Sequence, residues 1–170
     1  MTDAPRVRKW MADMRVIRFT VVVPSPEYGP LQPYTPFEAD RYLESLVLDS
    51  SRKSFAIEID GRHVGNVGLK ELHPDNPEAE CFIELGERSA RGKGVGKAAM
   101  ALLLDLAFGP YNLAGMRLGV FEFNLPAIGL YRALGFVDDG LYGHHHTDGR
   151  VWNILAMRLE RSAWTQHRAP

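Results

Sequence analysis

The spacing of apolar residues predicts alternating helices and strands in the second half of the chain. Six apolar positions fall on one helix face, at i, i+3, i+4, i+7, i+8 and i+11: Val95, Ala98, Ala99, Leu102, Leu103 and Leu106. Gly109-Pro110 follows and is expected to end this helix. Strand-like apolar runs lie on either side, at 79–86 and 116–123, and a shorter helical pattern covers 126–134.

Capping and turn residues define the elements of the first half. Thr35-Pro36-Phe37-Glu38 predicts a helix start, with Thr as the cap, Pro at the first helical position and Glu three residues after the cap. Asp60-Gly61 predicts a tight turn between two strands. The other segments are the two strands at 55–59 and 64–72, a short helix over 6–14, a β-branched run at 17–23, and a closing hairpin of 136–146 with 151–161. This order predicts a mixed sheet flanked by helices.

Composition narrows the class of protein. The 170 residues carry a formal net charge of −1, so neither nucleic acid nor an anionic membrane is expected as the main partner. One cysteine excludes an internal disulfide framework, no apolar run approaches the ~20 residues of a membrane span, and the first residues lack a secretory h-region. We therefore expect one domain over residues 1–170 that works in the reducing cytoplasm.

The glycine-rich stretch Arg91-Gly92-Lys93-Gly94-Val95-Gly96 carries the most specific chemistry. Three glycines at alternate positions let backbone N–H groups converge at a helix start, where the helix dipole favours a phosphate or pyrophosphate. A P-loop would need Gly at 91 or 87 and a Ser or Thr after the lysine, and a dinucleotide fingerprint would need Gly at 97. None of these is present. The remaining alternative is a glycine-rich helix start without a ligand.

The pattern Arg-x-x-Gly-x-Gly resembles the pyrophosphate-binding motif of the GNAT superfamily of acyl-CoA N-acyltransferases. A second motif of that family follows in the right order, with a strand and then Asn124, Ala127-Ile128, Tyr131 and Gly135-Phe136. Further features resemble the RimJ/RimL-type branch: Ala79-Glu80, Phe108, and Asp148-Gly149-Arg150 with Met157. The resemblance covers about residues 8–161 of the chain.

Two features depart from the family pattern. Members normally have a first strand before the position of Trp10, and this sequence begins almost there, so either the true start lies upstream or the fold lacks that strand. A sheet edge exposed in this way favours pairing with a second copy of the chain as a homodimer. Asn153 stands where the branch often has an acidic residue, so the acceptors of the ribosomal-protein enzymes are not carried over.

The resemblance implies an α/β (α+β) fold: a mixed, mostly antiparallel, twisted sheet flanked by helices and splayed at the acyl-CoA site. The pantetheine arm of acetyl-CoA would lie in the splay against exposed backbone, and its pyrophosphate would lie on the N–H groups of 92–96, with Arg91 or Lys93 adding charge. Asn124 would contact the arm or cap the following helix. The implied cofactor-binding residues are Leu85, Gly86, Arg91, Gly92, Lys93, Gly94, Val95, Gly96, Lys97, Asn124 and Tyr131.

Catalysis in such an enzyme needs a neutral amine and a proton for the leaving thiolate. Tyr131 matches the family's general acid, because a phenol is protonated at neutral pH; the alternative is a tyrosine of the core. Glu80 matches a family position for the base, and Glu84 shares its strand parity unless a bulge lies between them. The alternatives are that both are surface charges and that water relays the proton.

His144-His145-His146 could suggest a metal site, but consecutive strand residues point to opposite faces, so we expect no metal.

The resemblance predicts an N-acetyltransferase that moves the acetyl group of acetyl-CoA to a primary amine by direct attack. The amine would belong to a small molecule or a peptide N-terminus. A non-catalytic acyl-CoA-binding sensor or scaffold is the alternative.

Overall fold

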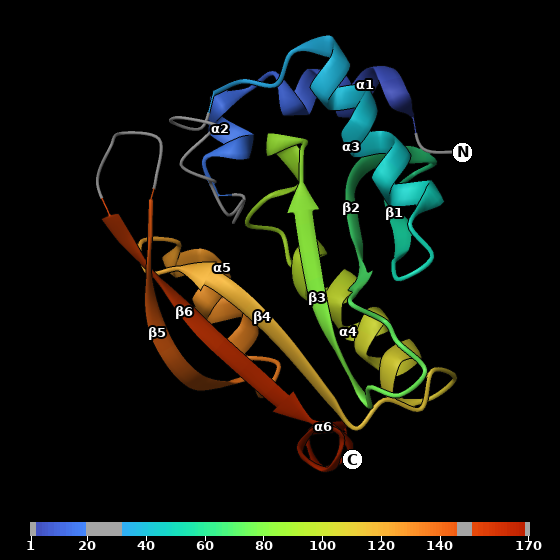
Figure 1. The fold of residues 1–170 in the computed structure, drawn as a ribbon, viewed down its shortest axis with the longest axis vertical. Helices are drawn as coiled ribbons and strands as arrows, with labels where there is room; N and C mark the ends of the chain where they lie inside the picture. The colour runs from blue at the N-terminus through green and yellow to red at the C-terminus, as the bar shows by residue number, and fades with distance from the viewer. Residues whose placement is uncertain (1–2, 20–31, 146–150, 169–170) are drawn as a thin grey trace.

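The chain folds into one open six-stranded sheet with helices packed on it (Figure 1). The structure is a computed structural model that describes residues 3–19, 32–145 and 151–168. Its helices are α1 (Ala4–Met11), α2 (Met14–Ile17), α3 (Pro36–Leu48), the short 3₁₀ helix η1 (Arg88–Ala90), α4 (Val95–Phe108), α5 (Leu125–Arg132) and α6 (Arg161–Arg168). Its strands are β1 (Lys53–Ile59), β2 (Arg62–Lys70), β3 (Glu78–Leu85), β4 (Gly115–Phe121), β5 (Val137–His145) and β6 (Val151–Glu160).

The sheet is divided into two halves by one short parallel pairing. The strand order is β1-β2-β3-β4-β6-β5, and neighbouring strands are antiparallel except β3 and β4. These two meet only from Glu78 opposite Gly115 to Glu80 opposite Arg117. Figure 1 shows β3 and β4 diverging from that junction, with β1 and β2 on one side and β5 and β6 on the other. The expected mixed, mostly antiparallel and splayed sheet is confirmed.

Alternate side chains of β3 point to opposite faces of the sheet. The Ile83 and Leu85 side chains approach the start of α4, because a Cβ atom placed on Gly96 would lie 3.6 Å from a methyl carbon of each. Glu84, between them, points the other way and accepts a hydrogen bond from Tyr42 of α3. Helices α4 and α3 therefore cover opposite faces of the same strand.

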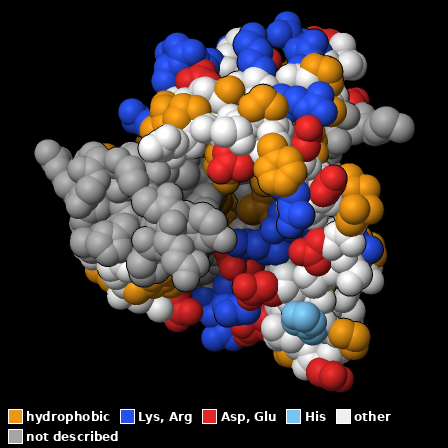
Figure 2. Space-filling view, turned by 45° about the horizontal axis from the view of Figure 1, so that its top comes forward, with side chains coloured by type: hydrophobic (Ala, Val, Ile, Leu, Met, Phe, Trp, Pro, Cys, Tyr) orange, Lys and Arg blue, Asp and Glu red, His pale blue; other side chains and the backbone are white. Residues whose placement is uncertain are grey.

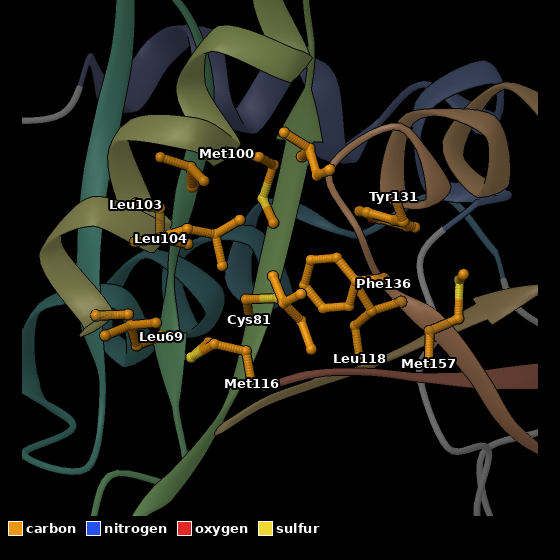
Figure 3. Packing of buried hydrophobic residues seen from close by; sticks show 14 of the residues in the cluster. Leu69, Cys81, Met100, Leu103, Leu104, Met116, Leu118, Tyr131, Phe136 and Met157 are labelled. Carbon is orange, nitrogen blue, oxygen red and sulfur yellow. The ribbon is translucent and has the colours of Figure 1, made fainter. Parts of the chain in front are cut away.

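Helix α4 buries a different face from the one that the apolar spacing predicts. Its buried residues are Gly96, Met100, Leu103, Leu104, Ala107 and Phe108, and Figure 3 shows the long side chains of this face pointing toward the strands. Leu102 is 67% exposed and Ala98 is also exposed. The helix is apolar around most of its circumference, so spacing alone selects the wrong stripe. The close contact at Gly96 identifies the buried face, because a Cβ atom at this position would lie 3.1 Å from Leu130.

The N-terminal segment forms two short helices instead of the single one expected over 6–14. Asp13 separates α1 from α2, since its side chain accepts a hydrogen bond from the Arg15 backbone and caps α2. Ile17, the first residue of the β-branched run at 17–23, therefore ends a helix, and residues 20–23 of that run lie outside the described residues. The capping box of Thr35 and Glu38 on α3 is confirmed.

Helices α1, α2 and α3 form a second, smaller core. Val7, Trp10 and Met11 of α1 pack with Ile17 and with Ala39 of α3. Two large apolar residues of α3 are exposed: Phe37 at 73% and Val47 at 72%. Helix α6 was not expected from the sequence; it is fixed by Trp164, which is buried and donates from Nε1 to Asp105 at 3.0 Å.

Strand β1 forms one edge of the sheet. The described residues before it are helical or irregular, so no earlier strand covers this edge within ranges 3–19 and 32–52. This agrees with a fold that lacks the family's first strand in the described part. Pairing of this edge with a second copy of the chain stays a prediction.

Trp10 joins the smaller core to the end of β3. A Cβ atom on Gly86 would lie 1.9 Å from the indole of Trp10, so the ring lies directly against the Gly86 backbone. The indole Nε1 also donates to Glu87 at 3.3 Å. Any side chain at position 86 would push α1 away from the strand end.

We expect Gly86→Ala to destabilise the protein by about 2 kcal/mol, the usual cost of overpacking a close contact. Denaturation by urea measures this loss. Gly129→Ala is the matched control, because nothing lies within 4 Å of a Cβ atom at that position of α5. Alanine in place of glycine within a helix should stabilise slightly. Equal stability of Gly86→Ala and the wild type would contradict the contact.

Candidate active site

The divergence of β3 and β4 leaves a slot between two halves of one sheet. Past Glu80 and Arg117 the two strands share no pairing, while β3 stays paired with β2 up to Leu85 and β4 with β6 up to Phe121. The backbone groups of β3 and β4 that face the slot are therefore available to an extended ligand. At the vertex, the Cys81 thiol donates to the Arg117 carbonyl at 3.5 Å.

The glycine loop stands at the open end of β3 and leads into α4. Gly92 and Gly94 have φ angles of +71° and +78°, the left-handed region that favours glycine, and nothing lies within 4 Å of a Cβ atom at either. Gly94 caps α4 without a side chain, so the N–H groups of the first helical turn face open space. Lys93 and Lys97 are exposed beside them. The binding of a pyrophosphate by this loop stays a prediction.

Arg91 has a different orientation from its neighbours in the loop. Its guanidinium donates to the Leu85 carbonyl from Nε at 3.0 Å and from Nη2 at 2.6 Å, and to the Arg15 carbonyl from Nη1 at 3.3 Å. Burial lowers the pKa of this guanidinium from its usual value. The side chain is thus occupied in joining β3 to α2. Of the two cations that the sequence offers for the pyrophosphate, Lys93 is the exposed one.

Glu84 is the most perturbed acid of the site. Tyr42 donates to its Oε2 at 3.4 Å, and burial raises the pKa of the Glu84 carboxyl to about 7, against the opposing effects of the Tyr42 bond and the Arg91 charge. Burial, and then Glu84 itself, likewise raises the pKa of Tyr42 well above its usual value. A carboxyl that titrates near neutral pH is suited to accept a proton from an ammonium group.

Glu80 lies four residues before Glu84 on β3, and its side chain is on the same face of the strand. The pairing of β3 with β2 runs without a bulge from Glu80 to Glu84, so the expected shared parity is confirmed. Lys70 forms an ion pair with Glu80, Nζ to Oε1, at 2.7 Å. The two carboxyls are about 13 Å apart along the strand, at ~3.3 Å per residue, so one amine cannot contact both. Figure 2 shows a hollow near the centre of one molecular face with acidic and basic side chains around it.

Tyr142 of β5 approaches Gly119 of β4 from this side. A Cβ atom on Gly119 would lie 2.9 Å from the Tyr142 hydroxyl, so the glycine makes room for the phenol. Burial, and then the charge of Glu80, raises the pKa of Tyr142. The sequence does not indicate which side chain lies beside Gly119. That a tyrosine from a distant strand lies there is shown by the fold.

Tyr131 lies on the α5 side of the slot, in the main core. Its ring packs on Phe136 with centroids 5.8 Å apart (Figure 3), and burial raises the pKa of its hydroxyl. It therefore stays protonated at neutral pH, as a proton donor must. Burial also raises the pKa of the Cys81 thiol to about 12, which makes that thiol a poor nucleophile.

Asn124 stands at the N-cap position of α5, where the chain leaves β4. Its side chain makes no capping hydrogen bond to α5, although its backbone carbonyl accepts from Ala127 and Ile128. Of its two expected roles, the side-chain cap is therefore absent, and contact with a ligand in the slot stays a prediction.

The described residues contain no cluster of three or more metal-ligating side chains. His146 lies outside them, as do the side chains of His144 and His145, so the histidine run is not described. Among the helices in the described ranges, none is long and apolar enough to cross a membrane.

Sequence reasoning missed Tyr42, Asn66 and Tyr142, which flank the candidate acids. Tyr42 and Tyr142 lie far from the glycine loop along the chain and belong to no motif. The signal for Asn66 was a polar residue within an apolar strand pattern, and it is only 1% exposed.

Comparison with known proteins agrees with this geometry. The model of the acetyltransferase (GNAT) family matches residues 16–136. The chain belongs to this family. It is 30% identical to spermidine N(1)-acetyltransferase of Escherichia coli K12 over 142 residues, which cover 82% of this chain and 76% of that protein. It is 27% identical to the Vibrio cholerae protein of the same name over 136 residues, 78% of each chain.

The fold is also that of a solved GNAT enzyme. The crystal structure of Vibrio cholerae spermidine N-acetyltransferase in complex with CoA and spermine superposes with a TM-score of 0.80. It is 22% identical, with 96% of this chain and 92% of that chain covered. Family membership and the 30% identity to a spermidine acetyltransferase show that the protein is an acetyl-CoA-dependent N-acetyltransferase, and the non-catalytic alternative is not supported. The narrower RimJ/RimL-type assignment is not distinguished by these relatives.

Glu84 should make stability depend on pH. Its pKa is raised from 4.5 to about 7 on folding, so the folded state holds the proton longer and stability falls as pH rises between these values. We expect Glu84→Gln to stabilise the protein at pH 8 by up to about 3 kcal/mol, several degrees in Tm, and far less at pH 4.5.

Calorimetry at both pH values measures this effect. Glu80→Gln is the matched control on the same strand face, because it removes a partly exposed ion pair and should cost under about 1 kcal/mol. A Glu84→Gln protein that is equally or less stable than wild type at pH 8 would show that the buried carboxylate is better solvated than its surroundings indicate.

Proposed function

We propose that this enzyme transfers an acetyl group from acetyl-CoA to a primary amine of a polyamine such as spermidine. The observation that carries the proposal is the similarity to spermidine acetyltransferases over about four fifths of the chain. Glu80 and Glu84 support it, because both face the side of the sheet opposite the glycine loop's helix, and a polycation suits carboxylates. The arginines on that face are paired with acids: Arg117 Nε with Glu78 at 3.4 Å and Arg158 with Glu160 at 2.7 Å.

The glycine loop and the slot would hold the acetyl donor. Backbone N–H groups of residues 92–96 would donate to the pyrophosphate, with Lys93 and Lys97 adding charge. The Leu85 and Gly86 backbone would position the arm, although the Leu85 carbonyl already accepts from Arg91. Acetyl-CoA supplies the reactive thioester. Asn124, with its side chain free of the helix cap, would contact the arm on the opposite wall.

Two proton transfers would complete the reaction. Glu84 takes one proton from the ammonium, which frees the lone pair to form the C–N bond at the thioester carbonyl. As the C–S bond breaks, the Tyr131 hydroxyl gives its proton to the sulfur, and the second proton of the attacking nitrogen restores the phenol. The products are the acetamide, CoA with a free thiol and one proton. Glu80, paired with Lys70, would attract the cationic acceptor without taking its proton.

The acceptor is tested by thiol release with acetyl-CoA and three amine classes: spermidine, a monoamine of similar length, and a peptide N-terminus. Spermidine should give the highest kcat/KM, with a product of one added acetyl mass. Tyr131→Phe should lower kcat by roughly 10²–10⁴ while acetyl-CoA still binds. A peptide turned over faster than spermidine, or equal turnover by Tyr131→Phe, would refute the acceptor or the acid respectively.

The cradle is tested by Gly94→Val. A branched side chain there would meet the phosphates, so we expect acetyl-CoA affinity to fall at least tenfold, about 1.4 kcal/mol, in titration calorimetry. Valine at position 94 would also strain the backbone, because the φ angle there is +78°, in the left-handed region. Gly61→Val carries the same strain at φ of +71° in the β1–β2 turn and should bind acetyl-CoA normally. Equal acetyl-CoA affinities of the two variants would contradict the binding of the pyrophosphate by this loop.

A further inference from the structure

The sheet face that carries Glu84 also buries two polar side chains of β2. His63 is 5% exposed and Asn66 is 1% exposed. Asn66 is the direct cross-strand partner of Glu84, so both side chains project from the same face with Cβ atoms about 5 Å apart. Neither residue belongs to a family motif, and the reaction described above does not use them.

His63 fixes the orientation of the Asn66 amide. The two side chains are joined by a hydrogen bond of 3.0 Å between His63 Nε2 and Asn66 Oδ1. Since Oδ1 can only accept, Nε2 carries the hydrogen. The His63 ring is held in turn by Trp10, whose ring centre lies 4.9 Å away in an edge-on contact. The Asn66 nitrogen Nδ2 then necessarily points away from His63.

Besides His63 Nδ1, two atoms on this face are buried and have no partner among the described residues: Asn66 Nδ2 and Glu84 Oε1. One is a donor and the other an acceptor, and they belong to directly paired residues. Leaving both unsatisfied would be costly. No direct hydrogen bond joins them, and a buried water commonly connects such groups.

We propose that Asn66, oriented by His63, donates through one bridging water to Glu84 and holds it in position to accept the amine proton. The water accepts from Nδ2 and donates to Oε1, while Tyr42 donates to Oε2. Both carboxylate oxygens are then satisfied. Asn66 and His63 are thus positioning residues, and this role rests on the proposed function of Glu84 as the base.

The charged and polar groups around Glu84 determine how much the water bridge changes the pKa of its carboxyl. Tyr42 of α3 donates to the carboxylate, Arg91 of the glycine loop supplies a nearby positive charge, and Tyr34 lies close enough to be affected by the Glu84 charge. A donor on Oε1 favours the ionised form. Its removal should therefore raise the pKa of Glu84 above its value of about 7.

The test is a titration of the Glu84 carboxyl by ¹³C NMR, with the signal assigned by its loss in Glu84→Gln. In Asn66→Leu the midpoint should rise by roughly one pH unit, the scale of one hydrogen bond to a charged group. His63→Phe should raise it less, and His63→Gln, which can still donate to Asn66 Oδ1, should restore the wild-type midpoint. Ile57→Ala, a core change on edge strand β1, should leave it unchanged.

The titration needs no acceptor, so its outcome is separate from that of the proposed function. An unchanged Glu84 midpoint in Asn66→Leu would overturn the bridge; if that variant fails to fold, an unchanged midpoint in His63→Phe would do so. With spermidine, the acid limb of kcat/KM should move up by the same amount as the midpoint. A moved midpoint with an unmoved acid limb would support the bridge and overturn Glu84 as the base.

Discussion

The short parallel contact between β3 and β4 is the constraint on which the rest of the structure depends. Three residue pairs join the halves of the sheet, and beyond them each strand is hydrogen-bonded on one side only. An ion-pair cluster reinforces the closed end, where Glu78 meets both Arg117 and Arg158. Because the junction is fixed there, the divergence opens at the other end, beside the glycine loop and the start of α5. The slot is thus a consequence of strand pairing rather than of a surface loop.

Strand alternation then distributes the chemistry over the two faces of β3. Cys81, Ile83 and Leu85 face α4 and the core that contains Tyr131, whereas Glu80 and Glu84 face away from it. The proposed proton donor, Tyr131, and the proposed proton acceptor, Glu84, therefore lie on opposite faces of β3. The two groups also titrate differently, because burial favours the neutral form of each: the phenol keeps its proton and the carboxyl releases its own near neutrality.

Local signals made much of the fold predictable from the sequence. The capping box at Thr35 and the glycine-rich start of α4 require only neighbouring residues, and both are found where the sequence places them. The buried stripe of α4 was predicted wrongly, because its apolar residues surround the helix and only its contacts with α5 and the sheet select a face. The Arg91 bonds and the contact of Tyr42 with Glu84 join segments far apart in the chain, so no local pattern could have predicted them.

The placement of polar residues on β2 and β3 argues for a role beyond packing. Strand β2 is buried along most of its length, and an apolar side chain at Asn66 or Glu84 would avoid the desolvation of an amide and a carboxyl. Three of the buried unsatisfied atoms in the described residues, Asn66 Nδ2, Glu84 Oε1 and His63 Nδ1, belong to neighbouring side chains in one patch. Buried polar groups beside the slot lower the stability of the fold. A carboxyl whose pKa lies near neutral pH suits proton transfer, and this function would explain why the groups are present.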